Sequence, residues 1–308
     1  MPEYRHDAIL DRRVVVAAER ATRPHTTTLT PELRNGPETC PFCPGHEADT
    51  PPETYRVGPG APDTPGWDIR VVPNLYPIVG APEQGDASGA HEVIILSPDH
   101  DRAFAELELD QAVAVLLATR DRTRVHLEQG RAFAIAFINH GRGAGASIAH
   151  PHAQIVAPDG PAKAVTAMTG RFETDLIARE IADARTGDLL VVDGPAPAWC
   201  PPASWCPYLM RVAHRSTRAR FDEATDAEIR VVATAMHDAL GRLETLLGAV
   251  PYNAIVHSAP PDTRAAEMHW HVELVPRTAV IAGFELGSGT YANSVAPEQA
   301  AALLRDAR

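Results

Sequence analysis

Residues 150–154 read His150-Pro151-His152-Ala153-Gln154, with a polar side chain at every second position. Side chains alternate between the two faces of a strand, so His150, His152 and Gln154 are expected on one face. Burying such groups without partners costs on the order of 2 kcal/mol each, so this face should meet a ligand, a metal or a hydrogen-bonding loop. A polar face exposed to water is the alternative. Pro151 cannot donate a ladder hydrogen bond, which places the strand near a sheet edge or at a break in pairing.

A glycine-rich loop, Asn139-His-Gly-Arg-Gly-Ala-Gly145-Ala-Ser147, precedes this strand. Small residues let backbone N–H groups approach phosphate oxygens closely, although a plain turn is the alternative. A neutral imidazole is nucleophilic and can form a transient bond to phosphorus. One ring nitrogen must then be free, while the other donates its proton, and a backbone carbonyl of the same motif is the expected acceptor. Loop and strand together indicate phosphoryl-group chemistry.

The chain contains the same succession of elements twice, which indicates an internal duplication. In the first copy we expect a strand at 92–96 reaching His100, a helix at 107–127, a strand at 132–138, and then His150–Gln154. In the second copy we expect a strand at 208–212 reaching His214, a helix at 224–247, a strand at 252–256, and then His269-Trp-His271-Val-Glu273. The sequence therefore predicts an α+β fold made of two related units, residues 1–165 and 166–308, with a mixed or antiparallel sheet flanked by helices.

The overall charge argues against several kinds of partner. The 308 residues include 28 Lys and Arg against 40 Asp and Glu, for a formal net charge of −12. This balance gives no general electrostatic reason for binding nucleic acid or an acidic membrane. No apolar run approaches the roughly 20 residues of a membrane-spanning helix, and residues 1–13 lack the apolar core of a secretion signal, so we expect a cytoplasmic protein.

These motifs resemble those of the galactose-1-phosphate uridylyltransferase family in the histidine-triad superfamily. His-Pro-His-x-Gln after a glycine-rich loop resembles its active-site strand, and five further motifs occur in family order. They are residues 11–23, Cys40-Pro-Phe-Cys43, Asn74-Leu-Tyr-Pro77, Ser97-Pro-Asp-His100 and Gly283-Phe-Glu285. The resemblance therefore covers essentially the whole chain.

The resemblance implies an enzyme, usually dimeric, that exchanges the sugar phosphates of UDP-glucose and galactose 1-phosphate in two steps. His152 would attack the α-phosphorus, and Gln154 would steady the phosphoryl group. The expected substrate-binding residues are Arg20, Arg23, Asn139, Gly145 and Ser147 around the phosphates, Asn74 in the nucleotide pocket, and Glu285 at the sugar hydroxyls. A solvated surface pair is the alternative for the two arginines. The implied partners are a nucleotide sugar, a sugar 1-phosphate and a second copy of the chain.

Four cysteines are too few for a disulfide scaffold in a chain of this length, and the Cys40–Cys43 spacing suits a metal in a reducing compartment. The family places zinc on positions matching Cys40, Cys43, His100 and His150, a closed tetrahedral set that makes the metal structural. Two cysteines in a turn without metal is the alternative. Cys200 and Cys206 are expected to be buried thiols.

A second metal, iron or zinc, is bound in some family members at positions matching His257, His269 and His271. The carboxylate expected about sixteen residues beyond His152 is missing here, since residue 168 is Met and Glu173 is only the nearest candidate. We therefore expect no second metal and a hydrogen-bonded remnant of the duplication. No role follows from the sequence for His46, His91 or His140.

Three other functions remain open at this stage. An ADP-sugar or dinucleotide phosphorylase of the same branch would use an unchanged histidine strand. A triad-type hydrolase is disfavoured because Gln154 replaces a third histidine, and a neutral amide cannot protonate a poor leaving group. A zinc-containing module that binds a nucleotide or a protein without catalysis is the alternative from another class.

Overall fold

The computed structural model describes residues 2–22, 36–81, 87–160, 175–261 and 268–307. Its strands are β1 (Glu3–Asp7), β2 (Arg12–Val16), β3 (Tyr55–Val57), β4 (Ile69–Pro73), β5 (Gly89–Ile95), β6 (Ile135–His140), β7 (His152–Pro158), β8 (Leu190–Val192), β9 (Ala198–Trp199), β10 (Met210–Val212), β11 (Tyr252–His257), β12 (His271–Pro276) and β13 (Thr290–Asn293). Its α-helices are α1 (Leu109–Glu128), α3 (Leu176–Thr186), α4 (Asp226–Leu247), α5 (Gly283–Ser288) and α6 (Pro297–Asp306).

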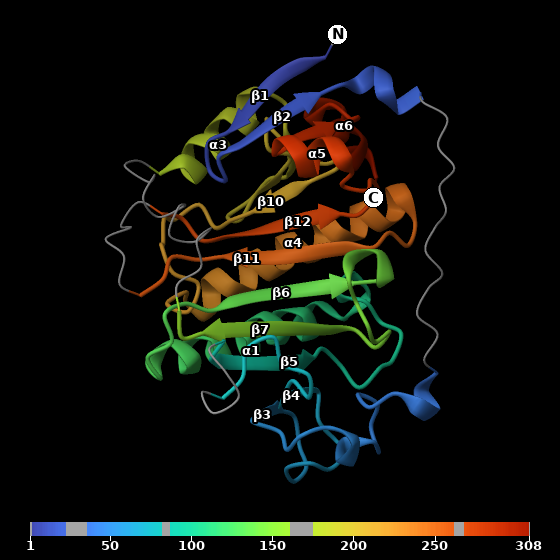
Figure 1. The fold of residues 1–308 in the computed structure, drawn as a ribbon, viewed down its shortest axis with the longest axis vertical. Coiled ribbons are helices and arrows are strands. Elements are labelled where there is room, and N and C mark those ends of the chain that lie inside the picture. Colours follow the sequence, from blue (N-terminus) through green and yellow to red (C-terminus); the bar gives the residue numbers. More distant parts are fainter. Residues whose placement is uncertain (1, 23–35, 82–86, 161–174, 262–267, 308) are drawn as a thin grey trace.

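Ten of these strands form one continuous sheet in the order β3-β4-β5-β7-β6-β11-β12-β10-β9-β8 (Figure 1). The duplication is visible in this order, because β5-β7-β6 of the first half corresponds to β10-β12-β11 of the second. The two sets meet where β6 and β11 pair antiparallel, with Ile138 opposite Ala254. The fold is therefore the predicted α+β duplication. Its boundary at residue 165 lies outside the described residues.

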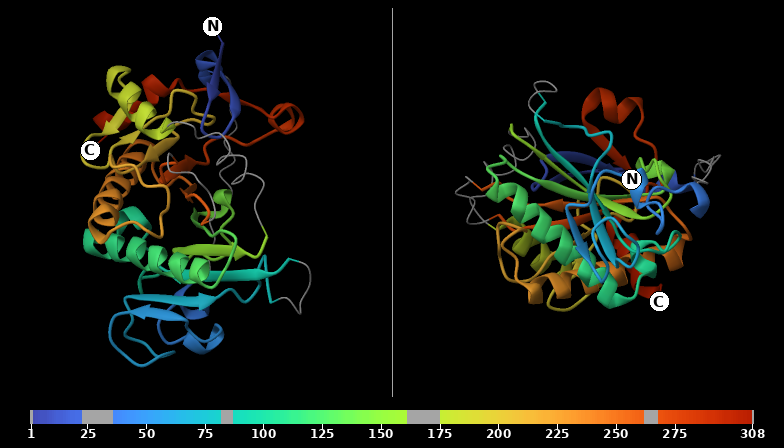
Figure 2. Two further views of the ribbon diagram at one scale, coloured as in Figure 1. Left: turned by 90° about the vertical axis from the view of Figure 1, so that its left-hand side faces the viewer. Right: turned by 90° about the horizontal axis from the view of Figure 1, so that it is seen from below.

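The two long helices, α1 and α4, cover one face of the sheet side by side (Figure 2). Apolar side chains such as Ala153, Ile155 and Leu274 point from the sheet into this layer. At the start of α4, Thr225 accepts a hydrogen bond from the Glu228 N–H, and Glu228 accepts one from the Thr225 N–H, so this helix begins with a capping box. Burial of this face leaves the opposite face of β7 for polar side chains.

A smaller sheet, β1-β2-β13, lies at the second-half end of the molecule beside α5 and α6 (Figure 1). At the other end, residues 36–50 pack against β4 and β5, where Phe42, Trp67 and Val93 belong to a separate apolar cluster. No helix among the described ranges is long and apolar enough to cross a lipid bilayer.

The structure corrects one expectation about the histidine strand. The strand begins at His152, directly after Pro151, so the proline lies at the break in pairing. A position near the sheet edge was the wrong alternative, because β7 is paired on both sides, with β5 and with β6. The missing N–H of Pro151 therefore costs no ladder hydrogen bond.

Candidate active site

The polar face of β7 carries the predicted catalytic side chains. Ala153 and Ile155 point into the core under the helices, so His152 and Gln154 point to the other face, as the alternation predicts. On that face the Phe42 ring contacts both His150 and His152, with ring centroids 6.2 and 5.3 Å apart. The two imidazoles therefore lie on the same side of the sheet.

The tautomer of His152 follows from a single hydrogen bond. Its Nδ1 lies 2.9 Å from the backbone oxygen of His150, and a carbonyl oxygen can only accept. Nδ1 therefore donates and Nε2 keeps its lone pair. Burial lowers the pKa of His152 below its ordinary value, which favours the neutral, nucleophilic ring.

A pocket lies against this face, with about 730 Å³ of empty space when the solvent at its open mouth is included, and its lining contains His152 and Gln154. Two other predicted residues, Asn74 and Ser147, also line it, together with Phe42 and Tyr76. Tyr76 is 84% exposed at the rim, where an aromatic face is available to a planar ligand.

The amide of Gln154 is held from behind by His91, a residue for which the sequence predicts no role. His91 Nε2 lies 2.9 Å from Gln154 Oε1, and the ring's Nδ1 accepts the Ile78 N–H at 3.1 Å. His91 is on β5, whose Val93 is directly opposite Gln154. No local signal in the sequence could have found His91, because it shares a face with Gln154 only through the register between β5 and β7.

The glycine-rich loop is held by the second half of the chain. Asn253 on β11 donates its side-chain Nδ2 to Asn139 Oδ1 and to Ala144 O, both at 2.8 Å. Gly145 has a φ of 91°, a backbone conformation that favours glycine. Phe137 is opposite Gln154 on β7, so Asn139, two residues further, shares the face of the catalytic strand. Neither Asn139 nor Gly145 lines the pocket itself.

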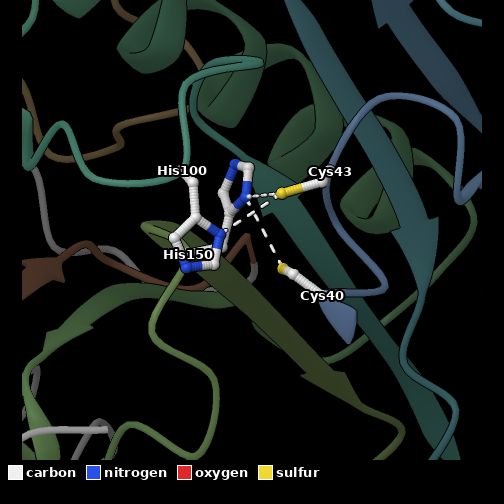
Figure 3. A group of neighbouring side chains, drawn as sticks. All are labelled: Cys40, Cys43, His100 and His150. Atoms are coloured by element: carbon white, nitrogen blue, oxygen red, sulfur yellow. Dashed lines mark hydrogen bonds between the residues drawn. The ribbon is translucent and has the colours of Figure 1, made fainter. Parts of the chain in front are cut away.

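Cys40, Cys43, His100 and His150 come together as predicted, with ligand atoms all within 4.8 Å of one another (Figure 3). Cys43 Sγ lies 3.3 Å from His100 Nδ1 and 3.5 Å from His150 Nδ1. His150 Nε2 donates to the Ser97 carbonyl at 2.9 Å, which leaves Nδ1 directed at the sulfurs. Burial raises the pKa of Cys43 to about 12, so a thiolate there requires a compensating cation.

Two of the predicted substrate-binding residues, Arg20 and Glu285, lie far in space from the pocket of their own chain. Arg20 is exposed at the N-terminal end, beside the small sheet. Glu285 is on α5, where its carboxylate accepts the Ala282 N–H at 3.0 Å. The short 3-10 helix Ala18–Thr22, which holds Arg20, and α5 lie at the opposite end of the molecule from β3 and β4 (Figure 1). Neither Arg20 nor Glu285 lines the pocket. Arg23 lies outside the described residues.

The three histidines of the second half, His257, His269 and His271, make contacts that differ from those of the Cys2His2 cluster. His257 and His271 stack with ring centroids 4.8 Å apart, and His269 Nδ1 lies 3.4 Å from Asp175 Oδ2. No motif in the sequence pointed to the Asp175 carboxylate. Residue 168 and Glu173 lie outside the described residues. All three rings have a buried nitrogen without a hydrogen-bond partner among the described residues, so the expected hydrogen-bonded remnant is not fully formed.

The remaining cysteines agree with the sequence. Cys200 and Cys206 are free and buried, and burial raises the pKa of both thiols well above the ordinary value. They are therefore unreactive parts of the core.

Comparison with known proteins identifies the family. Residues 88–306 match the family model described as "Domain of unknown function (DUF4921)", and the chain belongs to that family. Over 99% of its length, the chain is 28% identical to an ADP-glucose phosphorylase of Arabidopsis thaliana, of which it covers 93%. It is 27% identical to a galactose-1-phosphate uridylyltransferase of Thermotoga maritima, again over 99% of its length and 98% of that protein. The chain is a member of the galactose-1-phosphate uridylyltransferase family.

Solved structures agree with this assignment at the level of the fold. The crystal structure of the Arabidopsis thaliana ADP-glucose phosphorylase with bound ADP-glucose superimposes with a TM-score of 0.88 at 24% identity, over 100% of this chain and 99% of that one. A uridylyltransferase structure gives a TM-score of 0.73 at 24% identity, over 100% and 98%. The protein is therefore a family enzyme of the nucleotidyltransferase or phosphorylase kind.

Proposed function

We propose that the protein transfers a nucleotidyl group from a nucleotide sugar to a phosphate acceptor through a covalent bond to His152. One observation carries this proposal: the hydrogen bond from His152 Nδ1 to the His150 carbonyl leaves Nε2 unprotonated in a ring that lines the pocket. This matches the requirement for a nucleophile already in the correct tautomer.

The reaction proceeds in two balanced displacements. The Nε2 lone pair attacks the α-phosphorus, the bond to the bridging oxygen breaks, and a sugar 1-phosphate leaves. A phosphate oxygen of the acceptor then attacks the same phosphorus, and the P–N bond returns its electron pair to Nε2. No proton is needed by either leaving group, because one is a phosphate anion and the other an imidazole. The His150 carbonyl stabilises the ring while it is positively charged.

Two pairs of substrates fit this chemistry. Uridylyl transfer from UDP-glucose to galactose 1-phosphate is supported by the His-Pro-His strand, the motifs in family order and the 27% identity to the Thermotoga maritima enzyme. Adenylyl transfer from an ADP-sugar to inorganic phosphate has comparable support, from the 28% identity to the Arabidopsis thaliana phosphorylase. We keep uridylyl transfer as the first candidate and ADP-sugar phosphorolysis as the second.

The test measures both half-reactions. The protein is incubated separately with UDP-glucose and ADP-glucose, each labelled at the α-phosphorus, and acid-labile label on the chain is counted. Galactose 1-phosphate or inorganic phosphate is then added. Label from UDP-glucose that galactose 1-phosphate removes supports the first candidate, and label from ADP-glucose that phosphate removes supports the second. A wild-type chain that takes no label from either donor contradicts the proposal and favours a binding module.

We further propose that the Cys2His2 cluster holds one structural zinc ion. Zinc would link residues 40–43 to the loop before β7 and neutralise the two buried sulfurs as thiolates. We expect one zinc per chain by elemental analysis, and a Cys43→Ser variant that unfolds at lower temperature and holds less zinc. A Cys200→Ser variant is the control, because Cys200 is buried outside the cluster. Equal zinc content in both variants would contradict the assignment.

The distance of Arg20 and Glu285 from the pocket leads us to propose a homodimer in which they reach the partner's site. Beside Glu285, Val280, Phe284 and Leu286 are 89%, 54% and 78% exposed, as in many interfaces. Light scattering should give twice the mass of one chain. Mixing inactive His152→Ala and Glu285→Ala variants should restore activity in mixed dimers, and unchanged inactivity would contradict shared sites. The cytoplasmic location stays a prediction.

A further inference from the structure

We propose that His91 is a positioning residue that orients the Gln154 amide, so that its N–H groups point at the phosphoryl oxygens of the substrate. This inference rests on the nucleotidyl transfer proposed for His152. It adds a residue to the site for which the sequence motifs indicate no role. His91 would act only through Gln154 and would not touch the substrate.

The hydrogen bonds around His91 determine which of its nitrogens carries the proton. A backbone N–H can only donate, so His91 Nδ1 accepts from Ile78 at 3.1 Å. In a neutral ring the proton is then on Nε2, which donates. Burial lowers the pKa of His91, and its side chain is among the buried polar groups, so the neutral ring is favoured.

Two groups lie within reach of the Nε2 proton, and only one can accept it. The amide nitrogen of Asn74 is 3.1 Å away, but the Asn74 Oδ1 already accepts the Tyr76 N–H at 2.8 Å, so a donor faces His91. Gln154 Oε1, at 2.9 Å, is therefore the acceptor. With its oxygen bound on this side, Gln154 presents its NH2 group away from His91, and Gln154 lines the pocket.

This arrangement answers a chemical need. A free glutamine amide can present either its oxygen or its nitrogen to a ligand, and an oxygen facing a phosphoryl group is repulsive. An amide held in the donating orientation requires no reorganisation when negative charge develops on phosphorus. His91 also holds Ile78, which follows the pocket residues Asn74 and Tyr76. Its two nitrogens thus serve different parts of the site.

Two substitutions of His91 each remove one of its two hydrogen bonds and keep the other. In His91→Gln, the new amide nitrogen lies near the position of Nε2 and can still donate to Gln154, while the acceptor for Ile78 is lost. In His91→Asn, the side-chain oxygen lies near the position of Nδ1 and can still accept from Ile78, while the donor to Gln154 is lost. We expect His91→Asn to lower kcat at least about 10-fold with little change in KM. His91→Gln should keep kcat within about threefold and raise KM.

A double-mutant comparison distinguishes the positioning role of His91 from a purely structural role. In a Gln154→Ala background, His91→Asn should have no further effect on kcat, because the amide it orients is gone. An equal loss of kcat in both backgrounds would overturn the proposal. His237→Asn is the matched control, since His237 Nε2 donates to the Leu107 carbonyl at 2.9 Å far from the pocket, and kcat should not change. Thermal unfolding midpoints of all variants show whether folding is affected.

A measurement independent of activity completes the test. In protein with 15N-labelled histidine, the His91 ring should show a protonated Nε2 and an unprotonated Nδ1, the reverse of His152. The opposite tautomer at His91 would overturn the proposal. If the wild type takes no label from either nucleotide sugar, the proposed function fails. If it takes label but His91→Asn retains full kcat, only the inference about His91 fails.

Discussion

β7 and β12 begin with the same local geometry but differ in what their histidines face. His271 Nδ1 lies 3.1 Å from the His269 carbonyl, as His152 Nδ1 lies 2.9 Å from that of His150. His152 lines the pocket, whereas His271 is fully buried. The correct tautomer is therefore not sufficient for a nucleophile, because phosphorus must also be able to reach the ring.

The residues paired with Gln154 and Glu273 on the adjacent strands, β5 and β10, also differ between the two halves. Gln154 is opposite Val93, which leaves its amide to donate into the pocket, whereas Glu273 is opposite Arg211. Arg211 is fully buried and binds Glu273, Asp7 and Glu180 at 3.2, 2.6 and 2.9 Å. Burial alone would raise the pKa of Glu273, but its contact with a neighbouring imidazole and the Arg211 charge outweigh burial and lower that pKa. The second half has therefore replaced a ligand-facing amide with an internal ion cluster.

The largest expected effect separates the two imidazoles. His152→Ala should lower nucleotidyl transfer by at least about 10⁴-fold, because the attacking atom is lost. His271→Ala should reduce thermal stability by about 2–5 kcal/mol through the cavity left in the core, and leave kcat of the folded protein nearly unchanged. Labelling of the chain and calorimetry measure the two effects. Loss of labelling in a folded His271→Ala variant would remove the contrast between the two strands.

The next effect tests the ion cluster. Arg211→Met should destabilise the protein by about 3–5 kcal/mol, because three carboxylates lose their buried counter-charge. Denaturant unfolding at neutral pH measures this. An exposed arginine is the control: Arg230→Met removes a pair with Asp110 at the surface and should change stability by less than about 1 kcal/mol. Similar stability of both variants would show that Arg211 does not hold the second half together.

In the first half, Glu92 should make the stability of the fold depend on pH, with an effect of similar size. Burial alone would raise the pKa of Glu92, but the His126 imidazole 3.0 Å away and the hydrogen bonds from Arg122 and Thr54 outweigh burial and lower that pKa from 4.5 to about 2. A lowered pKa means that the ionised Glu92 stabilises the fold above pH 4.5, by about 3 kcal/mol, and that this contribution is lost as the pH falls through 2. Glu92→Gln should therefore be less stable than wild type at pH 7, and the difference should shrink below pH 4.5. A constant difference across pH would contradict this assignment.

The smallest effect concerns the contact between the halves. Asn253→Ala removes the donor to Asn139 and to the Ala144 carbonyl, so the glycine-rich loop should lose its position. We expect kcat to fall about 10-fold, which corresponds to the free energy of roughly one hydrogen bond. Folding should be nearly unaffected. Asn253→Ser keeps a shorter donor and should recover part of the rate. Wild-type kcat in Asn253→Ala would show that the second half does not support the loop.

The sequence predicted several elements of the fold closely. The helices expected at 107–127 and 224–247 are Leu109–Glu128 and Asp226–Leu247, and the strand expected at 252–256 is Tyr252–His257. The common face of His152 and Gln154 follows from a spacing of two residues. The Cys40–Cys43 turn is equally local. Such features can be predicted from the sequence because each depends on the geometry of a single helix, strand or turn.

Other features depended on how distant segments meet. The hydrogen bond from His91 to Gln154 joins residues 63 apart, and the ion pair of Arg211 with Asp7 joins residues 204 apart. The separation of Glu285 from the pocket is of the same kind, since α5 lies at the far end of the molecule from β3 and β4 (Figure 1). None of these relations has a local pattern that could have predicted it.

Short patterns in the sequence were enough to predict the repeated units, the common face of His152 and Gln154, and the Cys40–Cys43 turn, because each has a fixed period or spacing. The resemblance to a family added His100 and His150 to the two cysteines. Three features required the packed molecule: β7 borders a pocket while β12 is buried, His91 orients Gln154, and Arg20 and Glu285 lie away from their own chain's pocket. The physical reason is that strand register and packing between distant segments depend on the whole core, and no single segment carries that information.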